Sequence, residues 1–377
     1  MTDALHSRST RPLLNVCAVG DPRSPGVWSG TAANLTGALE RAGHLGRAIS
    51  TRGPRPLSLV LNVADWLAYG REHQGRGPTL RTHRALNAAR LTARSPTRDT
   101  LHFTTASLPF PGRRPAGQRH FLYVDATWEQ WGAPDRIGQG WTERLRRVAE
   151  RLERRAFAQV EHVFVTGANV RDSLTGHYGV PADRVSVAGT GHGSVTPFTG
   201  EKDYGARRLL FVAKDRFEDK GGPLLLDAFR IARQADPRLT LDLVGQGHRR
   251  DEIPPVDGLT VHGYLAKEEL RALFERASLF TMPAPHEPWG LVYLEALVCR
   301  TPILGLARNA FPELSGDGAY GYTAADTSAE AVARTIVEAC ADPAELARRG
   351  AAGQAHTLST YTWDLTARRI VDVVSTL

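Results

Sequence analysis

The stretch HEPWGLVYLEA, residues 286–296, is the part of the chain on which the interpretation of the fold depends. It follows an apolar run at residues 277–282, which predicts a buried strand, and a Pro-Ala-Pro sequence that ends this strand. From Pro288 onward the apolar residues recur at helical spacing, and proline is tolerated in the first turn of a helix. Glu287 is therefore expected in the loop, just ahead of the helix.

Backbone N–H groups at the start of this predicted helix favour an anion. The amides of Trp289, Gly290 and Leu291 would have no partner within the helix, and the helix dipole adds about 0.3–1 kcal/mol for each exposed charge interaction. Glu295 lies about two turns further along. A ligand lying along the helix could place a diphosphate at the amides and its hydroxyl groups at Glu287 and Glu295. A nucleotide sugar has those parts.

The same stretch resembles the Glu-x7-Glu signature of the retaining GT-B glycosyltransferases of family four (glycosyl transferases group 1). That signature usually has a wording close to E-x-F-G-L-x-x-x-E-A, and Trp289 stands here in place of the phenylalanine. The resemblance implies that Glu287 holds hydroxyls of the donor sugar and that Glu295 holds the ribose. It also implies an α/β fold of the GT-B type, in which two Rossmann-like domains with parallel sheets face a central cleft.

The length of the chain also predicts two domains. A single core stops growing near about 250–300 residues, whereas the chain has 377. By the resemblance, residues 1–200 form an acceptor-binding Rossmann-like domain and residues 201–360 a nucleotide-sugar-binding one. Residues 361–377 would form a terminal helix that packs back on the first domain, and the polar run at residues 194–207 would be the linker.

Lysine is rare in this sequence, which has 43 arginines and only four lysines. Where arginine is the default cation, a lysine indicates that a compact ammonium group is required. Lys214 and Lys220 follow a predicted strand at residues 209–213, and in a loop they can converge. Two cations about 4 Å from a diphosphate, at an effective dielectric constant near 20, would each contribute about 4 kcal/mol before desolvation. The resemblance places both lysines on the diphosphate of the donor, and a solvated charged loop is the alternative.

Two features of the first half of the chain resemble ligand-binding elements. Gly30 and Thr31 end a loop after the predicted strand at residues 13–19, and the resemblance implies that they contact the donor; a tight turn without a ligand is the alternative. Asp125 follows the predicted strand at residues 120–124, at the end where ligands bind in parallel sheets. Many family members carry a histidine near this position. Asp125 is thus a candidate catalytic residue or only the N-cap of the next helix, and the group that activates the acceptor stays open.

Three further segments have a recognisable pattern. Residues 57–63 are predicted to form a strand, residues 66–98 a basic and mainly helical region without an assigned role, and residues 141–159 an arginine-rich amphipathic helix. Gly263 and Tyr264 lie where the resemblance lets backbone groups meet the nucleobase of the donor. Those contacts do not identify the base.

Positive charge is concentrated in the first half of the chain. Residues 1–200 contain 26 arginines and no lysine against 15 acidic residues, whereas residues 201–377 contain 21 basic and 25 acidic residues. A basic half can attract a phosphorylated, anionic acceptor or a phospholipid surface, and it can also be a solvated arginine-rich face. A nucleic-acid partner is not expected, because no strip of basic and aromatic residues and no zinc-ligand spacing accompanies the charge.

Cysteine usage and hydropathy predict a cytoplasmic protein. Cys17, Cys299 and Cys340 lie in largely apolar surroundings and form no CxxC pair, as is typical of reduced core residues. Residues 1–12 lack the apolar core of a signal peptide, and no run of about 18 apolar residues is present.

These features predict an enzyme of the hexosyltransferase type. By the resemblance, it would move a sugar with retention from a nucleotide diphosphate sugar, its co-substrate, to a hydroxyl of a small-molecule, saccharide or lipid-linked acceptor. No cofactor and no metal are expected, since the chain lacks Asp-x-Asp, the metal-binding element of the other common glycosyltransferase fold. Lys214, Lys220 and the helix amides would stabilise the departing diphosphate instead. The alternatives are a catalytically silent sugar-nucleotide-binding subunit and a sugar phosphorylase.

Overall fold

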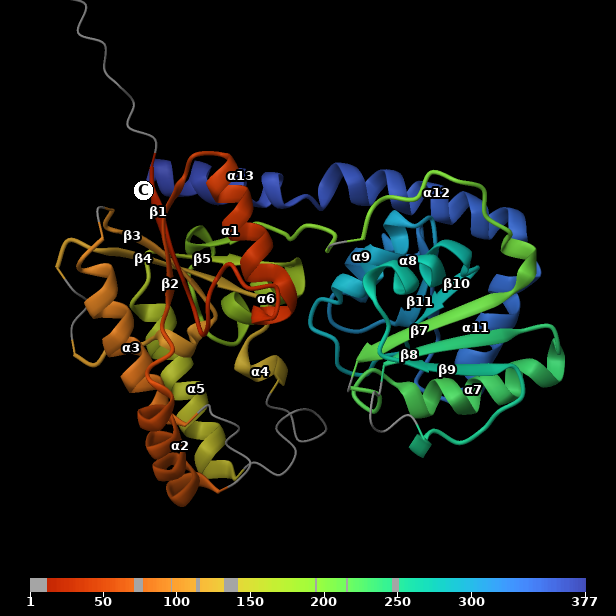
Figure 1. The fold of residues 1–377 in the computed structure, drawn as a ribbon, viewed down its shortest axis with the longest axis horizontal. Coiled ribbons are helices and arrows are strands. Elements are labelled where there is room, and N and C mark those ends of the chain that lie inside the picture. Colours follow the sequence, from red (N-terminus) through yellow and green to blue (C-terminus); the bar gives the residue numbers. More distant parts are fainter. Residues whose placement is uncertain are drawn as a thin grey trace, which may run out of the picture. The chain divides into compact units, whose positions relative to one another are not determined.

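A computed structural model shows two compact units, each built on a six-stranded parallel sheet (Figure 1). The structure describes residues 12–70, 77–95, 97–112, 116–131, 142–193, 195–214, 216–245 and 251–377. The first unit comprises Met1–Thr166, Val170–Gly189 and Trp363–Leu377, and the second comprises Gly167–Asn169 and Thr190–Thr362. The expected α/β architecture with two parallel sheets is confirmed.

The sheet of the first unit has the strand order β2-β1-β3-β4-β5-β6. Its strands are β1 Leu14–Ala18, β2 Leu45–Ser50, β3 Asp99–Phe103, β4 Arg119–Val124, β5 His162–Val165 and β6 Val185–Val187. Its helices are α1 Thr31–Arg41, α2 Arg55–Tyr69, α3 Pro78–Thr92, α4 Trp128–Trp131, α5 Glu143–Ala158, most of α6 Ala168–Gly176, and α13 Trp363–Thr376, which packs against α1. Strands β1 and β5 are buried along their whole length, because helices cover both faces of a parallel sheet.

The sheet of the second unit has the order β12-β11-β10-β7-β8-β9. Its strands are β7 Arg208–Lys214, β8 Thr240–Gly245, β9 Leu259–Gly263, β10 Leu279–Thr281, β11 Ile303–Leu306 and β12 Gly321–Ala324. Its helices are α7 Gly222–Ala235, α8 Lys267–Arg276, α9 Leu291–Val298, α10 Phe311–Ser315, α11 Ala329–Ala341 and α12 Pro343–Thr360. The apolar faces of these helices and the sheet form one continuous core, in which Phe229, Phe274 and Phe280 are fully buried.

The strand predicted at residues 57–63 is wrong, because this segment belongs to helix α2. Pro54 precedes the helix and a second proline stands in its first turn, where the fixed backbone angle of proline suits a helix. A short apolar run does not distinguish a strand from a helix by itself. The strand in this region is instead β2, an edge strand with one buried residue, Ile49, and therefore a weak apolar pattern.

The linker predicted at residues 194–207 is also wrong for the residues that the structure describes, since they are packed onto the second unit. The Lys202 ammonium donates hydrogen bonds to the backbone carbonyls of Phe274 and Ala277, at 2.9 and 3.0 Å. The Tyr204 hydroxyl donates to the Arg300 carbonyl at 2.6 Å. A polar segment can thus be part of a unit when its donors satisfy the carbonyl groups at the ends of helices and loops.

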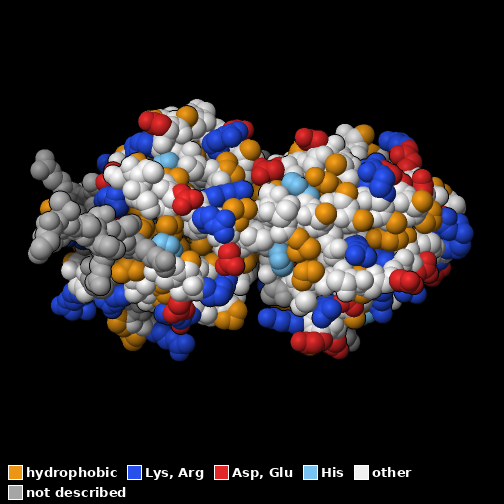
Figure 2. Space-filling model, turned by 90° about the horizontal axis from the view of Figure 1, so that it is seen from above, with side chains coloured by type: hydrophobic (Ala, Val, Ile, Leu, Met, Phe, Trp, Pro, Cys, Tyr) orange, Lys and Arg blue, Asp and Glu red, His pale blue; other side chains and the backbone are white. Residues whose placement is uncertain are grey.

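The basic region at residues 66–98 is mainly helical, as predicted, and consists of the end of α2 and of α3, although residues 71–76 and 96 lie outside the described part. Helix α5 begins at Glu143, and Thr142 is its N-cap. The predicted helix starts at Trp141, which lies outside the described residues. One face of the molecule is shown in Figure 2, where basic and acidic side chains are interspersed with apolar ones.

Candidate functional site

The loops after β7 and β10 meet at the point where the strand order of the second sheet reverses. Strand β7 pairs with β10 on one side and with β8 on the other, and all three run parallel. In open α/β sheets, ligands bind outside the carboxyl ends of the strands at such a reversal. Lys220 lies in the loop after β7 and Glu287 in the loop after β10, so both loops of the predicted site reach this position.

Lys220 and Glu287 form an ion pair, with 2.8 Å between Lys220 Nζ and Glu287 Oε2. The two side chains are only 15% and 13% exposed, so solvent screens the pair much less than a surface salt bridge. The structure therefore brings together Lys220, which is predicted to bind the diphosphate, and Glu287, which is predicted to bind the sugar. An ammonium group beside a carboxylate suits the junction between a phosphate and a sugar, because one group faces an anion and the other accepts from hydroxyls.

Gly221 explains how the two loops come so close. Its φ of +78° is left-handed, and it is the residue before the first turn of α7. A Cβ at this position would lie 2.1 Å from the carbonyl oxygen of Pro283, in the loop after β10. Only glycine permits this approach of two backbones, and the approach places the preceding residue, Lys220, beside Glu287.

Helix α9 begins one turn later than the sequence pattern predicts, at Leu291 and not at Pro288. The reason is Gly290, whose φ of +85° cannot be continued as a right-handed helix. The backbone groups available at the helix start are therefore those from Leu291 onward. The predicted amides of Trp289 and Gly290 belong to the preceding loop.

Tyr293 anchors the start of α9, and the sequence pattern had not singled it out. Its hydroxyl donates to the Met282 carbonyl at 2.6 Å, and its ring packs edge-on against Phe280 and Phe311. Burial, with a smaller contribution from Glu287, raises the pKa of Tyr293 well above its usual value, so the phenol remains a donor. The position of a large aromatic residue inside the Glu-x7-Glu stretch is the sequence signal by which Tyr293 could have been found.

Trp289 is buried, and its indole is already engaged within the second unit. Its Nε1 donates to the Thr190 hydroxyl at 2.8 Å, and its ring lies edge-on to Tyr361 at 5.8 Å. This side chain fixes the loop that carries Glu287. A role for Trp289 in donor binding remains a prediction.

Glu295 lies on α9 next to the glycine-rich turn at residues 189–193. A Cβ at Gly193 would lie 2.5 Å from Glu295 Oε1, so the turn passes directly over this carboxylate. The φ of Gly193 is +79°, which also requires glycine. Glu295 is half-buried, and its predicted partner, a ribose, remains a prediction.

Lys214, Gly263 and Tyr264 share the carboxyl edge of the second sheet with these loops. Lys214 is the exposed last residue of β7, and its φ of +46° turns the chain away from the strand. Gly263 ends β9 with a φ of +68°, and Tyr264 follows with 58% of its surface exposed. A role for these three residues in donor binding stays a prediction.

Gly30, Thr31 and Asp125 lie at the carboxyl edge of the first sheet. Gly30 caps α1 with a φ of +84°, and Thr31 is the buried first residue of that helix. Half-buried Asp125 follows β4, and its Oδ2 accepts a hydrogen bond from Trp28 Nε1 at 3.1 Å. In this sheet the strand order reverses between β1 and β3, so the loop with Gly30 also lies at a reversal.

Trp28 lies beside Asp125 at this edge of the first sheet, and the sequence pattern did not predict it as a site residue. Its ring packs edge-on against Phe103 and Tyr123, at 5.3 and 5.7 Å between ring centroids. Trp28 and Ser29 both have a φ of +52°, a left-handed conformation that costs about 1–3 kcal/mol for a residue other than glycine. Backbone strain of this kind is concentrated at ligand-binding loops. The sequence does not predict it here, because a tryptophan gives no sign of a left-handed conformation.

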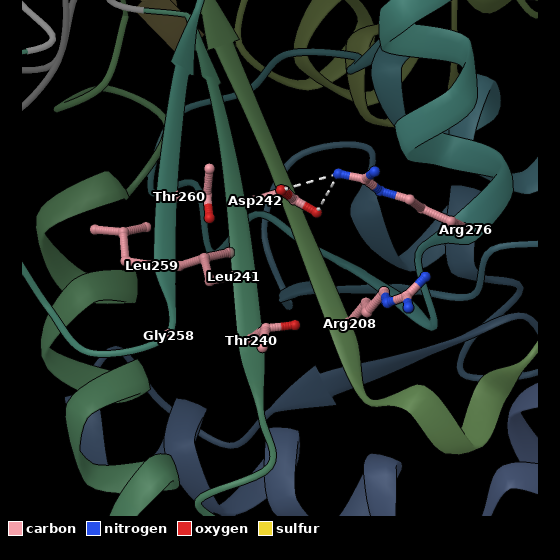
Figure 3. A pocket seen from close by; sticks show the side chains of 8 residues that line it. All are labelled: Arg208, Thr240, Leu241, Asp242, Gly258, Leu259, Thr260 and Arg276. Carbon is pink, nitrogen blue, oxygen red and sulfur yellow. Dashed lines mark hydrogen bonds and ion pairs between the residues drawn. The ribbon is translucent and has the colours of Figure 1, made fainter.

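A separate hollow of about 530 Å³ lies at the opposite edge of the second sheet, where β7, β8 and β9 begin. Figure 3 shows Arg208, Thr240 and Asp242 in it, with the Arg276 guanidinium 3.2 Å from Asp242. None of the predicted site residues lines this hollow. The hollow lies at the amino ends of the strands, whereas the loops with Lys220 and Glu287 lie at the carboxyl ends.

The arrangement of the chain is that of the GT-B fold. The structure of sucrose-phosphate synthase from Thermosynechococcus elongatus is similar over 97% of this chain and 99% of that one, with a TM-score of 0.70 and 16% identity. Anabaena HepE, whose structure contains UDP and glucose, is similar over 97% of this chain and 100% of that one, with a TM-score of 0.63 and 16% identity.

The sequence comparison finds a family model that matches most of the second unit. Residues 197–356 match the model "Glycosyl transferases group 1". Glycogen synthase of Mycobacterium tuberculosis is 26% identical over 246 residues, which is 62% of this chain. The chain matches 59% of the length of that relative.

The described residues contain no cluster of three or more His, Cys, Asp or Glu side chains that could hold a metal ion. Within the same described part, no helix is long and apolar enough to span a membrane. The three cysteines are free and buried.

Proposed function

We propose that the chain is a cytoplasmic, retaining glycosyltransferase that uses a nucleotide diphosphate sugar without a metal ion. The observation that carries the proposal is the ion pair between Lys220 and Glu287 at the strand-order reversal of the unit that matches the group 1 glycosyl transferase model. The UDP and glucose bound to the structural relative from Anabaena support a sugar nucleotide as the ligand class.

The proposed donor lies across the carboxyl edge of the second sheet. Its diphosphate faces Lys220, Lys214 and the first amides of α9, and its sugar hydroxyls face Glu287. Its ribose faces Glu295, while backbone groups at Gly263 and Tyr264 face the base. In this arrangement, fixed positive groups surround the diphosphate before the reaction begins, which is the condition for electrostatic catalysis.

In the proposed reaction the bond between the anomeric carbon and the diphosphate oxygen breaks, and the bond to the acceptor oxygen forms on the same face of the sugar. The electron pair of the broken bond stays on the diphosphate, where Lys214 and Lys220 stabilise it. The proton of the acceptor hydroxyl passes to a base as the new bond forms, and Asp125 is the candidate for that base. Gly30 and Thr31 keep their predicted role in contacting the donor. The acceptor is a small molecule, a saccharide or a lipid-linked sugar, and an anionic one suits the basic first half of the chain.

The test is a thermal-shift screen with UDP, GDP, ADP and dTDP sugars, followed by donor hydrolysis with and without EDTA. A ligand at about 100 times its Kd adds about 2.7 kcal/mol of stability, which is a readily measured increase in Tm. We expect one base to stabilise the protein and slow hydrolysis to continue in EDTA, with retention seen by NMR of the product. Donor binding without turnover until a second protein is added would favour the silent subunit, and phosphate-dependent cleavage of a disaccharide would favour a phosphorylase.

A further inference from the structure

Helix α2 exposes most of its apolar side chains, and its one buried residue is the polar Asp65. Eleven large hydrophobic residues are exposed in the described part of the chain, and six of them lie on this one helix. The exposed set comprises Leu57 at 42%, Leu59 at 65%, Val60 at 64%, Val63 at 41%, Trp66 at 38% and Leu67 at 75%. A contiguous apolar surface of this kind indicates an interaction site, because isolated exposed leucines are common but clusters are not.

The spacing shows that five of these side chains form one continuous face. Residues 59, 60, 63, 66 and 67 follow the i, i+1, i+4, i+7 and i+8 positions of a helix, which lie on one side. We call this side the outer face of α2. A surface helix of a globular domain normally turns such an apolar stripe toward the core. In α2 the apolar stripe faces solvent instead.

Asp65 explains why α2 is held with this orientation. It is the one fully buried residue of the helix, and its carboxylate accepts from the backbone N–H groups of Thr79 and Leu80 at 3.0 and 2.9 Å. These are amides of the first turn of α3, which have no partner within their own helix. The inward face of α2 is thus fixed by an N-cap interaction, and the outer face remains directed to solvent.

The segment of sequence that contains α2 is strongly basic. Residues 51–98 contain nine arginines and two acidic residues, whereas the whole chain of 377 residues has a net charge of +7. Arg52 and Arg55 are exposed at the start of α2, and the Arg144 guanidinium lies 5.2 Å from the centre of the Tyr69 ring at its end. The apolar side chains of α2 would fit an apolar layer, and the arginines at both ends of the helix would fit anionic groups that border such a layer.

We propose that the outer face of α2 docks on an anionic phospholipid surface, with Leu59, Val60, Val63 and Leu67 among the acyl chains, Trp66 at the headgroup level and the arginines at lipid phosphates. The helix, 15 residues and about 22 Å long, would lie in the plane of the interface. Tryptophan is favoured at this depth. A second copy of the chain is a less suitable occupant, because it would bring two arginine-rich surfaces together. The inference does not depend on the proposed enzymatic function.

The first test is flotation of the full chain with vesicles of phosphatidylcholine containing about one third phosphatidylglycerol. We expect binding to these vesicles, little binding to pure phosphatidylcholine, and weakening between 0.1 and 0.5 M salt, since the Debye length falls from about 10 Å. Each arginine at the surface contributes about a fivefold change in partition. The triple variant Leu59→Gln, Val63→Gln, Leu67→Gln should bind at least tenfold more weakly.

Controls separate this surface from general hydrophobicity and from the candidate active site. Leu358→Gln changes an exposed leucine of α12 and should leave vesicle binding unchanged. Lys220→Ala should also bind vesicles normally, so a failure of the donor site is distinguishable from a failure of docking. The triple variant replaces only exposed side chains and should keep the Tm and the donor hydrolysis of the parent protein in solution.

A second test measures depth at one position. The native cysteines are buried, so a polarity-sensitive thiol dye should label Leu67→Cys and, as a control, Leu358→Cys selectively. Anionic vesicles should shift the emission of the first to the blue and leave the second unchanged. Equal responses, or equal vesicle binding by the triple variant and the parent, would overturn the proposal. So would a parent protein that ignores anionic vesicles but forms a dimer, or a complex with an acidic protein, that the triple variant loses.

Discussion

Lys220 and Glu287 come from loops that follow two adjacent strands, β7 and β10, and their side chains lie 2.8 Å apart. Because both are mostly buried, each holds the other in position before a ligand arrives. A diphosphate that takes Lys220 as its partner would leave the Glu287 carboxylate for a sugar hydroxyl. The pair is therefore the most informative place to test the proposed function.

Replacing Lys220 by methionine keeps the length of the side chain and removes its charge. We expect kcat/KM for donor hydrolysis to fall at least 100-fold, about 2.7 kcal/mol, because a fixed cation no longer stabilises the departing diphosphate. Steady-state kinetics with the nucleotide sugar selected by the thermal-shift screen measures the effect. Lys267→Met, on the exposed first residue of α8, is the matched control and should change nothing. Unchanged kcat/KM in Lys220→Met would contradict the assignment.

Gly290→Ala should destabilise the protein and weaken donor binding. Alanine at a φ of +85° is strained, and its Cβ would lie 2.6 Å from the Tyr293 ring and 3.1 Å from Glu287 Cγ. Gly318→Ala is a close control, since its φ of +98° imposes similar strain but its Cβ would meet open space. Urea unfolding should show a loss of about 1–3 kcal/mol for Gly318→Ala and a larger loss for Gly290→Ala. Equal losses in the two variants would show that the contact with Tyr293 and Glu287 is unimportant.

Trp28→Phe keeps an aromatic ring beside Phe103 and Tyr123 but removes the donor to Asp125. We expect a loss of stability of about 1 kcal/mol and, if Asp125 serves the acceptor, a lower kcat with little change in the KM of the donor. Trp363→Phe is the control, because within the described part its Nε1 has no hydrogen-bond partner to lose. A kcat equal to that of the parent in both variants would count against a role for Asp125.

The buried pair His102 and His120 should make the first unit sensitive to acid. The ring nitrogens lie 3.0 Å apart, and burial, followed by the charge of His120, lowers the pKa of His102 well below its usual 6.5. The unfolded chain therefore binds a proton that the folded chain does not, so stability falls as the pH drops below about 6.5.

Urea unfolding between pH 7 and pH 5 tests this expectation. The free energy of unfolding should fall by up to about 1.4 kcal/mol per pH unit for one such group, and His102→Gln should reduce this slope. Above pH 7 the parent and the variant should have parallel profiles. An unchanged slope in the variant would assign the acid sensitivity to other groups.

The parts of the fold that could be predicted are those with strong local patterns. Buried parallel strands such as β4 and β7 contain continuous apolar runs, at residues 121–124 and 209–213, and α13 shows helical periodicity up to the end of the chain. A strand was predicted in place of α2 because a short apolar run fits a buried strand as well as a helix. Most apolar side chains of α2 face solvent, and the local pattern does not tell which side of a helix is buried.

The sequence by itself determined the chemical groups of the candidate site: two scarce lysines, two glutamates at fixed spacing and the glycines around them. Only the tertiary structure decided which of these groups meet, because the order of strands in a sheet is set by packing between segments far apart in the chain. That order places β7 beside β10, and Gly221 lets their loops touch, so Lys220 pairs with Glu287. The same long-range packing, through the capping of α3 by Asp65, turned the apolar side of α2 outward.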